Sequence, residues 1–193
     1  MRIPYALRNL RHRLRGLPQE AYRVARLKVA AELSFVHFTA CERGADGAVL
    51  LDALGIPLAF NRRIDYGVVS RRVVTTAGVN WLATAFTNTV EAESLNWHDV
   101  GTGTTAEAIG QTALVTPYGG SRASGTQSTP GSTNIYQSQA TITFAGTFAV
   151  TEHGLFTAST AGTLWDRSLF SAINVVSADS LQATHQTTFP SGG

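Results

Sequence analysis

The stretch TITFAGTFAVTEHGLFTASTAGTLWDRSLFSAINVVSADSLQATHQTTF, residues 141–189, decides the fold class of this chain. It divides into four short segments separated by Gly, Asn, Ser and Asp, in which apolar residues alternate with Thr, Ser and Gln. In its last segment, the residues on one face are Leu181, Ala183, His185, Thr187 and Phe189. A spacing of two is typical of strands with one face on a core. The stretch therefore predicts four strands of an antiparallel β domain.

The composition favours a protein that packs against other subunits. At 193 residues the chain is long enough for one domain with a hydrophobic core and an appendage. Only 15% of its residues are charged and Lys28 is the only lysine, whereas a soluble monomer usually carries more charge. No run approaches the roughly 18 apolar residues of a transmembrane helix, so we predict no membrane span.

The positive charge of the chain is concentrated at its N-terminus. Residues 1–28 hold seven arginines and one lysine against the single acid Glu20, a net charge of +7, whereas the rest of the chain holds seven arginines and twelve acids, a net charge of −5. Leucines at helical spacing predict two short helices with a break near Pro18. The basic residues of this arm are Arg2, Arg8, Arg11, Arg13, Arg15, Arg23, Arg26 and Lys28. We predict that they bind an acidic partner protein.

Other interpretations of the basic arm remain open. An Arg-rich, acid-poor leader is typical of mitochondrial transit peptides. A basic amphipathic helix can also lie on a membrane surface, and clustered arginines can bind the phosphates of a nucleic acid. Nothing downstream indicates a matrix enzyme, and of these interpretations we favour the acidic partner protein.

The expected fold class is mainly β: an antiparallel β-sandwich or jelly-roll-like domain with one covering helix and a basic, partly helical N-terminal arm. We expect a basic arm in residues 1–45, a linker that packs on the body in residues 46–70, and the β domain in residues 71–193. The apolar residues 33–38 could either continue the second helix of the arm or begin a strand. Thr76 is a suitable N-cap for a helix over residues 77–87, which would cover one end or edge of the sheet.

Two glycine-rich segments indicate loops. Residues 101–105, GTGTT, resemble the start of a phosphate-binding loop, but they lack the third glycine of a dinucleotide fingerprint and the lysine of a P-loop. We interpret them as a loop whose glycines need positive backbone angles. Residues 116–134 predict a long exposed loop or an edge strand, a frequent contact site in assembled proteins, with Tyr118 and Arg122 as candidate partner-binding residues.

The sequence does not predict an enzyme. It contains no motif for a nucleophile with its base, and none of the five histidines lies in a metal-binding spacing. A spatial cluster of His98, Glu152 and His153 is the one metal-site hypothesis that the inventory leaves. We therefore expect no catalytic residue, no cofactor, no metal and no small-molecule substrate.

Four motifs of this chain resemble those of a family of tailed-bacteriophage virion structural proteins. They are GTGTTA at 101–106, VTEHGLF at 150–156, LWDRSLF at 164–170 and NVVSADSLQAT at 174–184. The resemblance covers about residues 70–189 and leaves out the basic arm. We interpret the motif residues as builders of the fold, and the arm and the 116–134 loop as the contact regions.

The resemblance implies a structural role in a virion. It suggests a capsid decoration or cement protein on the capsid exterior, a homo-oligomer with a trimer as one form, whose arm binds an acidic surface of the major capsid protein. The alternative is a tail, baseplate or tail-fibre component involved in assembly or host attachment. A small glycan hydrolase would need acids clustered in a cleft, and the sequence shows no such pattern.

Overall fold

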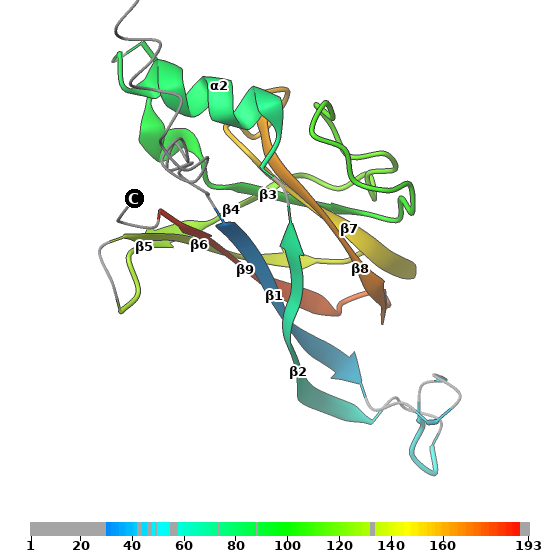
Figure 1. Ribbon diagram of the computed structural model, residues 1–193. Helices are drawn as coiled ribbons and strands as arrows, with labels where there is room; N and C mark the ends of the chain where they lie inside the picture. The colour runs from blue at the N-terminus through cyan, green and yellow to red at the C-terminus, as the bar shows by residue number, and fades with distance from the viewer. Residues whose placement is uncertain are drawn as a thin grey trace, which may run out of the picture. The chain divides into compact units, whose positions relative to one another are not determined.

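The computed structural model describes residues 30–41, 44–45, 48, 50–54, 58–72, 74–87, 89–131 and 134–189 (Figure 1). Every element described below lies in one compact unit, Val29–Phe189. The predicted helices of the basic arm lie outside the described residues.

Two antiparallel sheets form the body. The five-stranded sheet has the order β2-β1-β9-β6-β5, with β2 Ala59–Arg72, β1 Ala30–Cys41, β9 Ser180–Thr188, β6 Ile135–Thr143 and β5 Thr126–Ser128. The four-stranded sheet has the order β4-β3-β7-β8, with β4 Ala123–Ser124, β3 Trp97–Gly101, β7 Phe148–Phe156 and β8 Leu164–Val175. The predicted fold class, a mainly β antiparallel sandwich, is confirmed. The four strands predicted in residues 141–189 are β6, β7, β8 and β9.

The apolar core lies between the two sheets and draws on both. Its buried members are Leu33, Phe35, Val100, Ile142, Phe144, Val150, Ile173, Val175, Leu181 and Ala183. Along β9 every second residue is buried, from Leu181 to Thr187, as the alternation in the sequence predicts. The hydrophobic effect thus fixes which face of each strand turns inward.

The structure differs from the predicted domain division in residues 30–41 and 59–70. Residues 30–41 were expected in the arm, but they form β1, which pairs with β9 from Ala30 to Phe38. Residues 59–70 were expected in a linker, but they form most of β2, the edge strand beside β1. The segment 33–38 was compatible with either a helix or a strand, and pairing with β9 decides for the strand because it buries Leu33 and Phe35.

Helix α2 (Thr76–Ala85) covers one end of the sandwich, as predicted, although it begins and ends slightly earlier than expected. Thr75, and not Thr76, is its N-cap: the Thr75 hydroxyl accepts a hydrogen bond from the backbone N–H of Gly78 at 2.9 Å. Gly78 packs against Trp165 so closely that a Cβ atom at this position would overlap the tryptophan backbone. The helix is therefore anchored on β8.

The segment 116–134 contains the two edge strands β4 and β5, which belong to different sheets. The chain passes from one sheet to the other at Gly125, whose N–H donates to the carbonyl of Asn96 at 2.7 Å. A Cβ atom on Gly125 would overlap the side chains of Ser138 and His98. Only glycine fits this crossing, so the segment closes one side of the sandwich as well as presenting a loop.

Substitution of Phe35 tests whether β1 belongs to the core. Phe35→Ala is expected to lower the free energy of unfolding by about 3–5 kcal/mol, because it removes a fully buried ring. Phe38→Ala, on the opposite face of the same strand and half-buried, is the matched control and is expected to cost about 1 kcal/mol. Urea unfolding measures both, and equal small losses would contradict the assignment of residues 30–41 to the core.

Candidate functional site

The predicted partner-binding residues of the arm lie outside the described residues. They are Arg2, Arg8, Arg11, Arg13, Arg15, Arg23, Arg26 and Lys28. Their role in binding an acidic partner stays a prediction. The other two predicted contact residues, Tyr118 and Arg122, are described, and both are engaged in the packing of the body.

Arg122 holds the 116–134 segment on the outer face of the four-stranded sheet. Its Nη1 donates to the carbonyls of Ala158 and Ala161 at 2.8 and 2.6 Å. Its guanidinium lies 3.4 Å from the ring centroid of Phe156, and its Nε lies 3.5 Å from a carboxylate oxygen of Asp99. These contacts give Arg122 a structural role that the sequence analysis did not assign to it.

Tyr118 packs its ring against the edge of the apolar core. It meets Phe144 and Phe148 edge-on, with ring centroids 5.4 and 5.6 Å apart. The side chain is half-buried, so the ring serves the fold even though it borders solvent. Contact of either predicted loop residue with a partner stays a prediction.

The GTGTT loop is shaped by a buried carboxylate. Glu152 on β7 accepts hydrogen bonds from the backbone N–H groups of Gly103, Val115 and Thr116 at 3.1, 3.1 and 2.7 Å. The expected reason for the glycines is wrong, because the positive-φ glycines of the described residues do not include Gly101 or Gly103. Both must be glycine because a Cβ atom at either position would overlap the Glu152 carboxylate.

Arg167 on β8 completes this site from the other side. Its Nε donates to the Glu152 carboxylate at 2.6 Å, and its Nη1 donates to Thr105 O at 2.9 Å and to Gln111 Oε1 at 3.2 Å. Burial raises the pKa of Glu152, but hydrogen bonds from the Thr116 and Val115 backbone and from Arg167 outweigh it, so the pKa lies below its usual value. The carboxylate therefore stays ionised at neutral pH.

The Glu152–Arg167 site joins three of the four motifs that carry the phage resemblance. Glu152 comes from VTEHGLF, Arg167 from LWDRSLF, and the donor loop begins with GTGTTA. The N–H group of Gly103 that could face a phosphate already donates to Glu152. In the described part of the chain these motif residues therefore connect β7 and β8 to the loop after β3.

The fourth motif supplies Asp179, which connects the turn before β9 to β1. Its carboxylate accepts from the backbone N–H groups of Ala40 and Val176 at 2.9 and 3.0 Å, and it lies 3.1 Å from Nε2 of His37. The turn between β8 and β9 is thereby fastened to the end of β1. All four motifs thus contribute residues to contacts that join strands to loops or turns.

Replacement of Arg167 tests the buried ion pair. Arg167→Met is expected to lower the free energy of unfolding by about 3–5 kcal/mol, because Glu152 is left as a buried charge without a cation. Adding Glu152→Gln is expected to cost less than the sum of the single losses, with a coupling of about 1–3 kcal/mol. Urea unfolding of the four proteins of the double-mutant cycle measures this coupling.

An exposed ion pair provides the control for this cycle. Arg71 and Glu32 lie 2.7 Å apart on the surface of the β1–β2 hairpin. Arg71→Met is expected to cost at most about 1 kcal/mol. If Arg167→Met costs no more than Arg71→Met, the buried pair does not have the role described here.

A second polar cluster lies inside the sandwich, beside the apolar core. We use the name histidine cluster for His98 on β3, His153 on β7, Asp166 on β8 and His185 on β9, all of which are buried. Nδ1 of His98 lies 3.0 Å from Nε2 of His153, and Nε2 of His98 lies 2.8 Å from the Ser138 hydroxyl. The cluster therefore joins the two sheets through side-chain hydrogen bonds.

Burial keeps the three histidines of the cluster neutral at pH 7. Desolvation lowers the pKa of His98 and of His185 to about 3, and it lowers the pKa of His153 well below its usual value. Desolvation raises the pKa of Asp166 to about 7. Oδ1 of Asp166 and Nδ1 of His185 face each other at 3.6 Å, and both atoms lack a hydrogen-bond partner among the described residues.

The metal-site hypothesis places only two of its three residues together. His98 and His153 meet, but Glu152 projects from the opposite face of β7, where it meets Arg167. In the portion of the chain that the structure describes, His, Cys, Asp and Glu side chains form no group of three that could hold a metal ion. The sequence suggested the histidine pair, but His185 and Asp166 join it only through the pairing of strands far apart in sequence.

The histidine cluster predicts destabilisation by acid. As the pH falls below about 6.5, each of the three histidines gains a proton in the unfolded chain but not in the folded one. This protonation of the unfolded chain lowers the free energy of unfolding. Asp166 acts in the opposite sense, because the folded chain keeps its proton up to about pH 7. Near pH 5 the unfolded chain therefore binds about two protons more than the folded chain. The free energy of unfolding is expected to fall there with a slope of about 2.7 kcal/mol for each pH unit of acidification.

Urea unfolding between pH 7 and 5 measures this slope in the wild-type chain and in two variants. His185→Gln is expected to lower the slope by about 1.4 kcal/mol per pH unit, because one titrating group is removed. Gln186→Ala, on the outward face of the same strand, is expected to leave the slope unchanged. An unaltered slope in His185→Gln would contradict the assignment.

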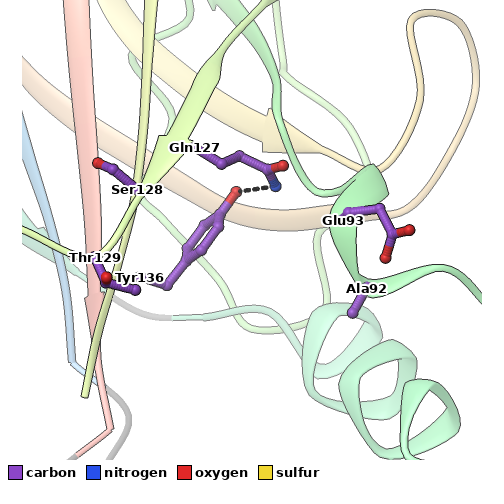
Figure 2. A pocket seen from close by; sticks show the side chains of 6 residues that line it. All are labelled: Ala92, Glu93, Gln127, Ser128, Thr129 and Tyr136. Atoms are coloured by element: carbon purple, nitrogen blue, oxygen red, sulfur yellow. Dashed lines mark hydrogen bonds between the residues drawn. The ribbon is translucent and has the colours of Figure 1, made fainter. Parts of the chain in front are cut away.

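An open hollow of about 410 Å³ lies between the short helix η3 (Ala92–Ser94) and strands β5 and β6. Figure 2 shows the residues that line it: Ala92, Glu93, Gln127, Ser128, Thr129 and Tyr136. The Tyr136 hydroxyl donates to the carbonyl of Leu95 and accepts from Gln127 Nε2 at 3.0 Å. The hollow thus has one fixed aromatic side chain with hydroxyl, amide and carboxylate groups around it.

Comparisons with known proteins give no relative for this chain. No protein-family model matches it, no curated protein matches it, and no solved structure matches it. Among the helices of the described residues, none has the length and apolar character needed to cross a membrane.

Proposed function

We propose that this chain is a structural virion protein of a tailed bacteriophage, a capsid decoration or cement protein on the outer capsid surface. In this proposal the basic arm binds an acidic surface of the major capsid protein, and the β-sandwich covers the junctions between shell subunits. Self-association of the chain, with a trimer as one form, completes the arrangement.

The observation that carries this proposal is the separation of charge along the chain. The arm has a net charge of +7 within residues 1–28, and the remainder has a net charge of −5. A segment of this density of charge attracts a surface of opposite sign, and it steers and orients the encounter. We therefore assign capsid binding to the arm.

The chemistry of the body supports a scaffold. Five of its titratable residues are buried in contacts that hold strands and loops together: Glu152, Arg167, His98, His153 and Asp166. By contrast, large apolar side chains are exposed on α2 and its C-cap, and on β2 and the segment before it: Val79, Phe86, Leu50, Leu51, Leu54, Leu58, Tyr66 and Val68. A surface of this kind suits packing against other subunits, in accord with the resemblance to virion structural proteins.

A tail, baseplate or tail-fibre role is the second candidate. The hollow beside Tyr136 favours it, because an aromatic ring surrounded by hydroxyl and amide groups suits a sugar ligand of a host receptor. Three of the lining residues, Gln127, Ser128 and Thr129, belong to the 116–134 segment. Gold-labelled antibody against the chain distinguishes the two roles by labelling either heads or tails of the virions that carry it.

Charge removal in the arm tests the proposed role on capsids. A full-length variant with all seven arginines of residues 1–28 changed to Gln is expected to bind capsids that lack the protein at least about tenfold more weakly, because the electrostatic attraction is lost. The matched control changes the same arginines to Lys, which keeps the charge and is expected to retain most of the binding. Co-sedimentation with capsids measures both, and wild-type binding by the Gln variant would contradict the role of the arm.

A further inference from the structure

Exposed apolar side chains gather at two separate places on the body. The first, which we name the leucine tip, consists of Leu50, Leu51, Leu54 and Leu58, between β1 and β2. The second, which we name the helix patch, consists of Val79, Phe86 and Ile109. Leu54 is 83% exposed and Phe86 is 85% exposed, so each place presents at least one large side chain almost entirely to solvent.

Two hydrogen bonds connect described residues of the leucine tip, which follows β1 and precedes β2. The N–H of Leu58 donates to the carbonyl of Leu50 at 2.9 Å, and the N–H of Leu54 donates to the Asp52 carboxylate at 2.8 Å. The pairing of β1 with β9 stops at Phe38, whereas its pairing with β2 continues to Cys41. The paired ends of β1 and β2 therefore extend beyond β9, as the two strands do in Figure 1.

The helix patch lies on a helix without charge. The sequence has no ionisable residue between Arg72 and Glu91, although the outer face of a solvent-exposed helix is usually charged. Val79 and Phe86 are seven residues apart and so project from the same side of α2 and its C-cap. Ile109 lies beside the start of this helix, because its carbonyl accepts from the N–H of Thr76 at 2.8 Å.

A leucine tip cannot reach the helix patch of its own chain. The two lie at opposite ends of β2, since the tip precedes Ala59 and α2 begins just after Arg72. At about 3.3 Å per residue, the 14 residues of this strand separate them by about 45 Å. Contact between them requires two copies of the chain.

We propose that the leucine tip of one copy docks on the helix patch of a second copy, so that the chain assembles head to tail. The two surfaces match because both are apolar: the helix patch has no ionisable residue, and the described charge within the tip, Asp52, is turned to the N–H of its own turn. Each copy keeps one tip and one patch unused after the first contact, so the assembly grows until it closes as a ring or extends as a filament. This association does not depend on a role in a virion.

Self-association of the purified full-length chain tests the proposal without any phage particle. Sedimentation velocity over a range of concentrations is expected to show assemblies larger than a dimer. Leu54→Asp and Phe86→Asp are each expected to weaken association at least about tenfold, because each places a charge in an apolar contact. Val68→Asp, at an exposed apolar residue on β2 that belongs to neither surface, is the control and is expected to assemble like the wild type.

Mixing the two variants tests whether the tip of one copy contacts the patch of another. Leu54→Asp keeps an intact helix patch and Phe86→Asp keeps an intact tip, so an equimolar mixture is expected to form dimers of one copy of each and nothing larger. Circular dichroism and thermal unfolding confirm that both variants are folded before they are mixed. The proposal is overturned if the wild-type chain stays monomeric, if neither substitution weakens assembly, or if the mixture forms no dimer.

Discussion

The Glu152 carboxylate is the constraint on which the rest of the body depends. A charge without solvent must be surrounded by donors, and here these come from Arg167 on the neighbouring strand and from the loop after β3. That loop consequently lies against the outer face of the four-stranded sheet, where Leu114 packs with Phe156. Around Glu152 and Phe156 the sheet is therefore buried on both faces, although most antiparallel sheets leave one face to solvent.

The interior of the sandwich combines two kinds of packing. One part is apolar and holds the sheets together by burial of surface, without directional contacts. The other part is the histidine cluster, whose hydrogen bonds from His98 to His153 and Ser138 fix how the sheets lie on each other. Because desolvation lowers the pKa of the three histidines, the fold is expected to lose stability in acid.

The proposed roles place the contacts of the protein at its extremities. The arm concentrates positive charge, and the leucine tip and the helix patch present exposed apolar side chains, whereas the motif residues serve the body itself. A rigid sandwich with separate attachment points suits a subunit that bridges its neighbours. The tip and the patch would join copies of the chain, and the arm would join them to a shell of opposite charge.

The sequence by itself determined the alternation that makes residues 141–189 strands, the capped helix near Thr75, and the charge of the arm, because these are local patterns. Only the tertiary structure decided that residues 30–41 are an inner strand, because an apolar segment suits a helix or a strand until β9 offers a partner edge. It likewise decided that Arg122 packs on Phe156 and that Gly103 is needed beside Glu152. Such contacts join residues far apart in sequence, and no local spacing encodes them.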